Sequence, residues 1–329
     1  MIPRANITAW RTHAPWPSNE QVEQDLMLSR ALVAMFGRQI IADQAIFRGG
    51  TALHKLFFGA SGRYSEDIDL VQRDAGPIGE LIDAIRETLD PWLGSPRWKQ
   101  GNGRFTLYYR FETTFAPVTT MQLKIEINTR EHFAVLGTTR QSFTVDNPWF
   151  KGTTELPVYH LDELLSTKMR ALYQRKKGRD LYDLWIALRS GEADSNRIVE
   201  CFQRYMDHDG ATVSRAEFEA NLTAKLRSDV FLEDIQLLIP ADVVYDPVTA
   251  AEIVQDELTA KLPGEPWRGG RECCRRRGDQ GVAPETTLSE APGAQNSAWY
   301  DAWYPLKTRE KSKKNTLKGV KKSVTGHGV

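Results

Sequence analysis

The sequence predicts an α+β fold, in which a mixed sheet with flanking helices is followed by a helical region. Two segments, 104–112 and 121–128, alternate apolar and polar residues with the two-residue period of a strand. The segment 19–37 instead places its apolar residues at helical spacing and ends at a glycine. From 161 to about 231 the pattern is helical again. These observations place the sheet in the first half of the chain.

Five elements are expected before residue 100, and each has a start or stop signal in the sequence. They are a helix at 19–37, a strand at 45–47, a helix at 51–58 after a Gly-Gly turn, a strand at 67–71, and a helix at 78–89 that ends before Pro91. Gly152 and Pro157 interrupt the strand pattern later, so we place the change to helical architecture between Phe150 and Leu161.

The chain is expected to divide into an α/β domain at 1–155, a helical domain at 156–263 and a tail at 264–329. The tail carries a net charge of +6 and little apolar periodicity, whereas the rest carries −6. A basic segment of this composition is typical of disorder. Such a tail can hold RNA by attraction to phosphates, and the alternative is a solvated extension with no specific role.

The composition is that of a soluble globular protein, with 41% hydrophobic and 26% charged residues in 329. The net charge of zero gives no global argument for binding nucleic acid or a membrane. Cys201, Cys273 and Cys274 have no spacing for zinc or a disulfide framework, which favours reduced thiols. Because we find no N-terminal signal and no apolar run of about 20 residues, we expect a cytoplasmic protein with no membrane partner.

Two aspartates one residue apart, in the strand "DIDLV", are the first candidate for chemistry. On a strand Asp67 and Asp69 project from one face, while Ile68 and Leu70 enter the core from the other. Two carboxylates so close resist joint ionisation unless a cation neutralises them. Oxygen ligands of this kind suit Mg²⁺, with a phosphorylated substrate completing the shell. The alternative is a loop in which Ser65 caps and both aspartates face water.

The turn "GGT" lies upstream of this strand. Glycines let the backbone approach a ligand, and the start of the following helix offers free N–H groups to a phosphate. The turn at Gly49, Gly50 and Thr51 therefore predicts phosphate binding, although it has neither the Walker spacing nor G-x-G-x-x-G. The alternative is a tight turn with a threonine cap.

Two later residues add to this constellation. Glu126 lies on the polar face of the strand "MQLKIEIN" and is a candidate third metal ligand or general base, the alternative being an exposed face paired with Lys124 or Arg130. Lys168 falls within the apolar stripe of the helix that begins at Leu161, so it needs a partner. A lysine in a cleft would neutralise phosphate charge; otherwise it lies at the edge of the stripe with its ammonium in water.

A basic cluster follows in "RKKGRDLYDLW", and its charges suit phosphates or an RNA backbone. Its members are Arg175, Lys176, Lys177 and Arg179. In the helix after it, Asp183 points away from the apolar side, and Asp180 is a candidate cap.

Together these segments resemble the AbiEii/AbiGii-type nucleotidyltransferase toxins, a branch of the DNA polymerase beta-like nucleotidyltransferases. The resemblance rests on "FRGGTALHK", "RYSEDIDL", "KIEIN", "ELLSTKMRAL" and "RKKGRDLYDLW", which span about Phe47 to Trp185. In the broader superfamily the turn is Gly-Ser and the gap to the acids is shorter, whereas here Thr51 replaces the serine and 15 residues intervene. The position of the phosphate-binding loop is therefore less closely defined.

The resemblance implies a nucleotidyltransferase fold, with the helical domain completing the cleft, and an enzyme that transfers NMP from an NTP with Mg²⁺, or Mn²⁺ as an alternative. Asp67 and Asp69 would hold the metals, and Gly50 and Thr51 the triphosphate. The remaining residues implied are Arg48, Lys55 and Ser65 at the nucleotide, Lys168 at phosphate charge, and Asp183 as a further catalytic residue. The implied acceptor is the 3′ end of tRNA, with translation arrested, and the implied partner is a cognate antitoxin, often a winged-helix repressor.

Two other interpretations stay open at this stage. A glycosyltransferase also uses Asp-x-Asp with a nucleotide diphosphate, although the glycine turn, Lys168 and the basic cluster argue against it. The chain could instead be a non-catalytic module that binds nucleotide or RNA, an idea weakened by the presence of all expected carboxylates.

Overall fold

The computed structural model describes residues 2–269. These residues belong to one compact unit. Most of the expected tail, including Cys273 and Cys274, lies outside the described residues, whereas Cys201 is a buried free cysteine. The division of the chain into three domains stays a prediction.

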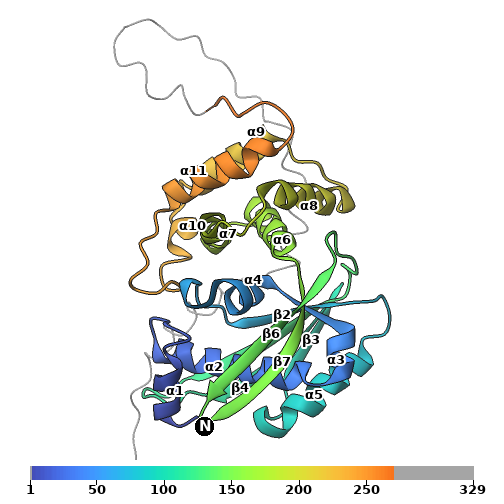
Figure 1. Ribbon diagram of the computed structural model, residues 1–329, viewed down its shortest axis with the longest axis vertical. Helices are drawn as coiled ribbons and strands as arrows, with labels where there is room; N and C mark the ends of the chain where they lie inside the picture. The colour runs from blue at the N-terminus through green and yellow to red at the C-terminus, as the bar shows by residue number, and fades with distance from the viewer. Residues whose placement is uncertain (1, 270–329) are drawn as a thin grey trace, which may run out of the picture. The chain divides into compact units, whose positions relative to one another are not determined.

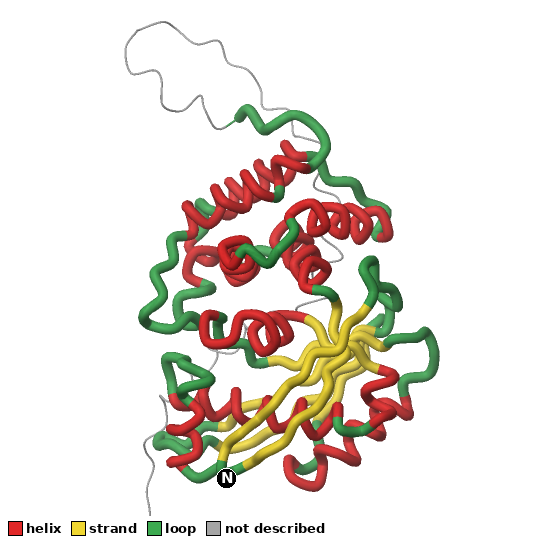
Figure 2. Tube along the Cα trace, in the orientation of Figure 1, coloured by secondary structure: helices red, strands yellow, loops and turns green. Residues whose placement is uncertain are grey.

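A seven-stranded mixed sheet forms the first part of the fold, in the order β3-β4-β5-β2-β1-β7-β6 (Figures 1 and 2). The strands are β1 (Ala45–Arg48), β2 (Asp67–Gln72), β3 (Arg97–Gly101), β4 (Arg104–Glu112), β5 (Thr120–Asn128), β6 (Thr138–Asn147) and β7 (Phe150–Tyr159). β2 pairs in parallel with β5, and β1 in parallel with β7; the other pairs are antiparallel. The predicted α+β class is confirmed.

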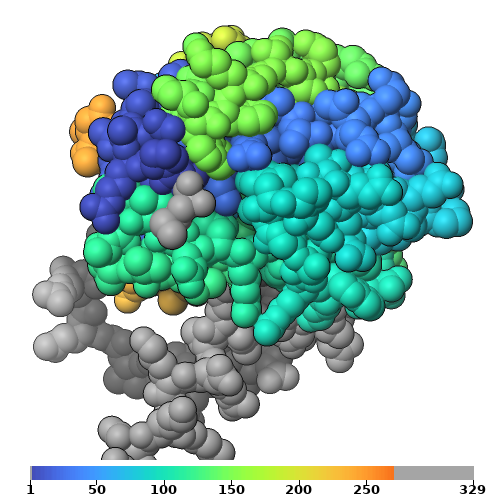
Figure 3. All heavy atoms as spheres, turned by 90° about the horizontal axis from the view of Figure 1, so that it is seen from below, coloured from blue at the N-terminus to red at the C-terminus, as the bar shows by residue number. Residues whose placement is uncertain are grey.

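Helices lie on both faces of this sheet (Figure 1). The helices before the last strand are α1 (Arg4–Trp10), α2 (Asn19–Phe36), α3 (Gln39–Gln44), α4 (Gly49–Leu53) and α5 (Gly79–Leu93), with a π-helix η1 (His54–Phe58) and a 3-10 turn η2 (Gly59–Ser61). α2 begins at a capping box between Ser18 and Gln21 and packs against β2, β5, β6 and β7. α5 packs against β4 and α2. Seen from below, α1 in dark blue lies beside the green β6–β7 hairpin (Figure 3), where Asn147 donates to the Asn6 carbonyl at 2.9 Å.

The second part of the fold is helical. Its elements are α6 (Leu161–Gln174), α7 (Gly178–Ser190), α8 (Ser195–His208), α9 (Arg215–Lys225), α10 (Asp229–Glu233), α11 (Pro247–Glu257) and a 3-10 turn η3 (Thr259–Lys261). α6 packs against α7, α8 and α4, and α4 in turn packs against β1 and β2 (Figure 1). The switch from strand to helix comes at His160, within the expected interval.

Two details of the expected secondary structure were wrong. α5 does not end before Pro91 but continues to Leu93, and Gly94 terminates it with a positive φ of 75°. The helix expected at 51–58 begins at Gly49 and becomes a π-helix from His54. The pattern analysis also did not find β3, β6 and β7.

Candidate active site

The two aspartates of β2 project from the face of the sheet opposite the core, as predicted. Ile68 and Leu70 between and after them are buried, and the Asp67 side chain is 30% exposed. Asp69 lies against the glycine turn that follows β1. A side chain on Gly49 would collide with the Asp69 carboxylate, and the φ of Gly49 is +82°. Both the space and the backbone conformation therefore require glycine there.

The acid pair is poorly neutralised by the protein. Burial raises the pKa of Asp67 to about 6, and the neighbouring Asp69 adds to this rise, although Lys124 opposes it. The Lys124 ammonium lies 3.0 Å from both the Asp67 and the Glu126 carboxylates. Glu126 is the register partner of Asp69 on β5, so the predicted third acid lies on the same face. Glu126 is paired with Lys124, as expected if this face of the strand is an ordinary polar surface.

These residues fit a divalent cation bound jointly with substrate. Among residues 2–269 no group of three or more His, Cys, Asp or Glu side chains is arranged to hold a metal ion. Mg²⁺, however, commonly takes one or two carboxylates and completes its shell with water and substrate phosphates. Burial, with a further contribution from Asp69, disfavours the charged form of Asp67, and a bound dication would offset both effects.

Cationic groups surround the second glycine of the turn. A Cβ placed on Gly50 would lie 2.8 Å from Arg63 Nη2, 3.2 Å from Ser65 Oγ and 3.5 Å from Lys168 Nζ. Because Gly50 has no side chain, its backbone and these polar groups stay close together. The Thr51 hydroxyl lies 2.8 Å from Ser65 Oγ and 2.5 Å from the Asp67 carbonyl oxygen. Thr51 thus fastens the turn to the start of β2, which places the glycines beside the acid pair.

Lys168 has the partner that its place in the apolar stripe requires. Its ammonium is buried and lies 3.0 Å from the Asp183 carboxylate and 3.5 Å from that of Asp180. Asp183 also accepts two 2.8 Å hydrogen bonds from Arg63, through Nε and Nη2. Burial alone would raise the pKa of Asp183, but Arg63, Lys168 and His54 hold it well below its usual range.

His54 completes the surroundings of Asp183. Burial lowers the pKa of His54 to about 4, so the imidazole is neutral near pH 7. Its Nδ1 lies 3.1 Å from the Arg63 backbone N–H and must accept from it, so the ring proton is on Nε2, which faces Asp183 at 3.2 Å. His54 and Arg63 were not predicted, since neither lies in a periodic segment whose pattern requires a charged partner.

A family model for the "Nucleotidyl transferase AbiEii toxin, Type IV TA system" matches residues 30–246. The chain belongs to this family. It is therefore a nucleotidyltransferase toxin of a type IV toxin–antitoxin system, and the family implies a nucleoside triphosphate substrate, a divalent metal and an antitoxin partner. The predicted resemblance is confirmed, and family membership decides against the glycosyltransferase alternative.

A solved toxin structure shares the fold of this AbiEii-family chain. The nucleotidyltransferase toxin MenT4 from Mycobacterium tuberculosis H37Rv has a TM-score of 0.58 at 20% identity, covering 80% of this chain and 91% of its own. A protein from H. pylori described as a nucleotidyltransferase has a TM-score of 0.48 at 17% identity, covering 73% and 93%. No curated protein sequence matches the chain. None of the helices at 2–269 is long and apolar enough to cross a membrane.

Two predicted nucleotide-binding residues are held elsewhere. The Lys55 ammonium lies 2.5 Å from Asp25, a buried carboxylate that also accepts from Trp10 and Trp16. Arg48 is the register partner of Asp69. Its guanidinium nevertheless lies 2.7 Å from Glu131, and that carboxylate raises the Arg48 pKa despite burial. The geometry thus gives both cations structural partners instead of a place beside the glycine turn.

The predicted basic cluster is largely neutralised. Arg175 binds Asp180 through two hydrogen bonds of 2.6 and 2.7 Å. Lys177 and Arg179 both bind Asp234, and Lys176 is the exposed member. These residues therefore do not form an unopposed patch for an RNA backbone, because two carboxylates from the helical part are built into it.

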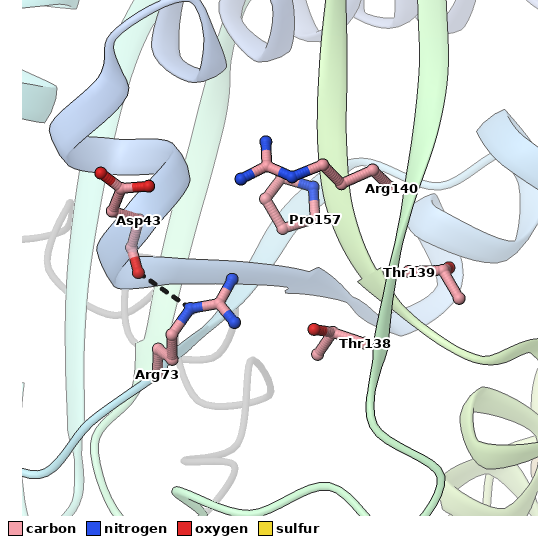
Figure 4. A pocket seen from close by; sticks show the side chains of 6 residues that line it. All are labelled: Asp43, Arg73, Thr138, Thr139, Arg140 and Pro157. Carbon is pink, nitrogen blue, oxygen red and sulfur yellow. Dashed lines mark hydrogen bonds between the residues drawn. The ribbon is translucent and has the colours of Figure 1, made fainter.

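A surface hollow of about 370 Å³ lies away from the acids. It is lined by Asp43, Arg73, Thr138, Thr139, Arg140 and Pro157, none of them a predicted site residue (Figure 4). Arg73 Nε donates to the Asp43 carbonyl at 2.8 Å, which fixes one wall. The candidate active site is therefore not this hollow but the open face beside the aspartates.

Proposed function

We propose that this toxin transfers a nucleoside monophosphate from an NTP to the 3′ end of tRNA with Mg²⁺ and thereby blocks translation. The acceptor hydroxyl oxygen forms a bond to the α-phosphorus, the bond between the α-phosphorus and the bridging oxygen breaks, and pyrophosphate leaves. The observation that carries the proposal is the acid pair with its raised Asp67 pKa, set against a glycine turn flanked by Arg63 and Lys168.

Each residue has a distinct part in this reaction. Asp67 and Asp69 would hold Mg²⁺, which supplies charge stabilisation at the reacting phosphate. Gly49 and Gly50 let the triphosphate approach the backbone, and Arg63 and Lys168 stabilise its negative charge. Asp183 touches no substrate but positions both cations.

The acceptor proton must go to a base on the same face. Glu126 is the next carboxylate beyond the acid pair, one strand away on β5. We assign it this role, which requires its ion pair with Lys124 to loosen when substrate binds.

Transfer of radiolabel tests the proposal. The protein is incubated with Mg²⁺, total tRNA and each of the four α-labelled triphosphates. We expect label in tRNA with at least one triphosphate, no label when the same triphosphate carries the isotope at the γ-position, and none with Asp67→Asn. Absence of label from RNA and protein under every condition would contradict nucleotidyl transfer, and label in protein alone would contradict the RNA acceptor.

The partner is proposed to be a cognate antitoxin of the winged-helix repressor type. Co-expression with the repressor encoded beside the toxin should restore growth, and a repressor that leaves growth arrested would contradict this partner.

A further inference from the structure

We propose that the polar face of strands β5, β4 and β3 is the docking surface for the RNA acceptor strand. The inference deepens the proposed function and rests on it for the identity of the acceptor. The surface begins at the catalytic aspartates and ends at the free edge of β3. We call it the strand ramp, comprising Arg97, Lys99, Tyr108, Arg110 and Lys124.

Strand register connects this surface to the acid pair. Asp67 is opposite Lys124, Lys124 is opposite Tyr108, and Tyr108 is opposite Arg97. Residues directly opposed in neighbouring strands project from the same face. Since strands lie about 4.8 Å apart, Arg97 is roughly 14 Å from Asp67 across the sheet. One row of side chains therefore runs from the metal-binding acids to the sheet edge.

A second row runs parallel to the first. Asp69 is opposite Glu126, Glu126 is opposite Thr106, and Thr106 is opposite Lys99. Arg110, opposite Gln122, is two residues along β4 from Tyr108 and projects from the same face. Three cations thus occupy the outer half of the ramp.

These outer cations are available to a ligand. Arg97, Lys99 and Arg110 are exposed, and within residues 2–269 no carboxylate is paired with any of them. The cluster at 175–179 differs, because Asp180 and Asp234 neutralise it. Unopposed cations at strand spacing complement a phosphate backbone, and Tyr108 supplies an aromatic side chain among them. Trp98, also exposed, projects from the opposite face of β3.

The position of the nucleotide site explains why the acceptor uses this face. Gly50, Arg63 and Lys168 belong to the turn after β1, the loop before β2 and helix α6, on one side of the aspartates. The acceptor hydroxyl must reach the α-phosphate from the other side, where β5, β4 and β3 extend. With a rise of about 3.4 Å per nucleotide in a stacked strand, the ramp accommodates roughly four nucleotides.

Salt-dependent binding of end-labelled total tRNA tests the ramp, with chelator present and no triphosphate, so that no chemistry occurs. The variant is Arg97→Ala/Arg110→Ala. Its matched control is Arg204→Ala/Arg227→Ala, which removes two exposed arginines from the helical part. We expect the ramp variant to bind about tenfold more weakly and to lose about 1.4 from the slope of log K against log salt, as for two phosphate contacts to a single strand. The control should match the wild type.

Several results would overturn the ramp. The ramp is contradicted if the two double variants bind tRNA equally, if only the control binds more weakly, or if the wild type does not bind tRNA. It is also contradicted if the ramp variant loses antitoxin binding while its tRNA binding is unchanged. Kinetics separate the two proposals. If the ramp variant is active and its KM for tRNA is unchanged, the ramp is contradicted and the proposed function is kept. If the wild type binds tRNA through the ramp but transfers no nucleotide, the proposed function is contradicted and the ramp is kept as a binding surface.

Discussion

Two pairs of aspartates, Asp67 with Asp69 and Asp180 with Asp183, show how environment separates similar sequence signals. The first pair lies on a strand, and burial together with the neighbouring Asp69 raises the pKa of Asp67 to about 6. The second lies on α7, is fully buried, and has pKa values lowered by nearby cations. Burial acts in the same direction on both pairs. The cations decide the difference, because Asp183 faces both Arg63 and Lys168 and also accepts a hydrogen bond from neutral His54.

This difference in counter-charge indicates that one aspartate pair is suited to binding a ligand and the other to positioning its neighbours. A carboxylate pair with too little counter-charge gains by binding a dication. A carboxylate saturated by arginine and lysine gains nothing from one and instead holds those cations in place. Asp183 is thus part of the frame that holds Lys168 and Arg63, while Asp67 and Asp69 are the pair that we propose meets the substrate.

The largest effect is expected from Asp183→Asn. The substitution leaves Arg63 buried without its counter-charge and Lys168 with Asp180 alone, so the free energy of unfolding should fall by about 3–5 kcal/mol. Urea denaturation followed by circular dichroism measures it. The control is Asp146→Asn, which removes an exposed carboxylate paired with exposed Lys151 and should leave the unfolding midpoint unchanged. A midpoint shift no larger for Asp183→Asn than for the control would remove the distinction between the two pairs.

A smaller effect, on activity alone, is expected from Asp67→Asn. Loss of one metal-binding carboxylate should lower nucleotidyl transfer roughly 10²–10³-fold, with the folded state retained because the neutral amide relieves repulsion with Asp69. The rate of label transfer and the unfolding midpoint are measured together. Glu66→Gln changes the preceding exposed carboxylate and should stay active. An Asp67→Asn enzyme as active as the wild type would refute the metal assignment.

The smallest effect is a pH dependence of opposite sign in the two pairs. The pKa of Asp67 is raised in the folded state from 3.8 to about 6, so its stabilising contribution is complete below about pH 4 and is lost as the pH rises through 6. The wild type should thus lose about 2 kcal/mol relative to Asp67→Asn between pH 4 and 7. The lowered pKa of Asp183 makes its contribution present above pH 4 and lost in stronger acid.

Unfolding free energies measured across this pH range, with and without Mg²⁺, test the sign. Mg²⁺ should abolish the loss at pH 7, because the dication replaces the proton as counter-charge. If the stability of the wild type relative to Asp67→Asn rises with pH in the absence of Mg²⁺, the predicted direction of the Asp67 pH dependence is wrong.

The sequence predicted those helices and strands in which apolar residues recur with a single regular period. β2, β4 and β5 each alternate buried apolar residues with polar ones, and α6 has its leucines at helical spacing, so their patterns are unambiguous. β7 was missed because Gly152 and Pro157 resemble turn signals. In the structure a Cβ on Gly152 would lie 2.8 Å from Val33 of α2, so this glycine permits close helix packing. Pro157 is tolerated since β1 and β7 share only the register pair Phe47–Val158.

The candidate site also has residues that the sequence could predict and residues that it could not. The acid pair, the glycine turn and Lys168 could be predicted, because each breaks an otherwise regular pattern. Arg63 could not, since it lies in a loop and its partner Asp183 is 120 residues away. The carboxylate partners of the cluster at 175–179 could not be predicted for the same reason. Asp234, which pairs with two of its cations, is more than 50 residues further along the chain.

The pairing of Arg63 with Asp183 also bears on when the toxin becomes active during its own synthesis. A nascent chain that has released β1 to β7 from the ribosome holds both aspartates of β2 and the glycine turn. It still lacks the carboxylate that orders Arg63 and Lys168. Competence therefore arrives only with α7, after all seven strands have been made, and the ribosome that makes the toxin finishes that helix before the enzyme can act.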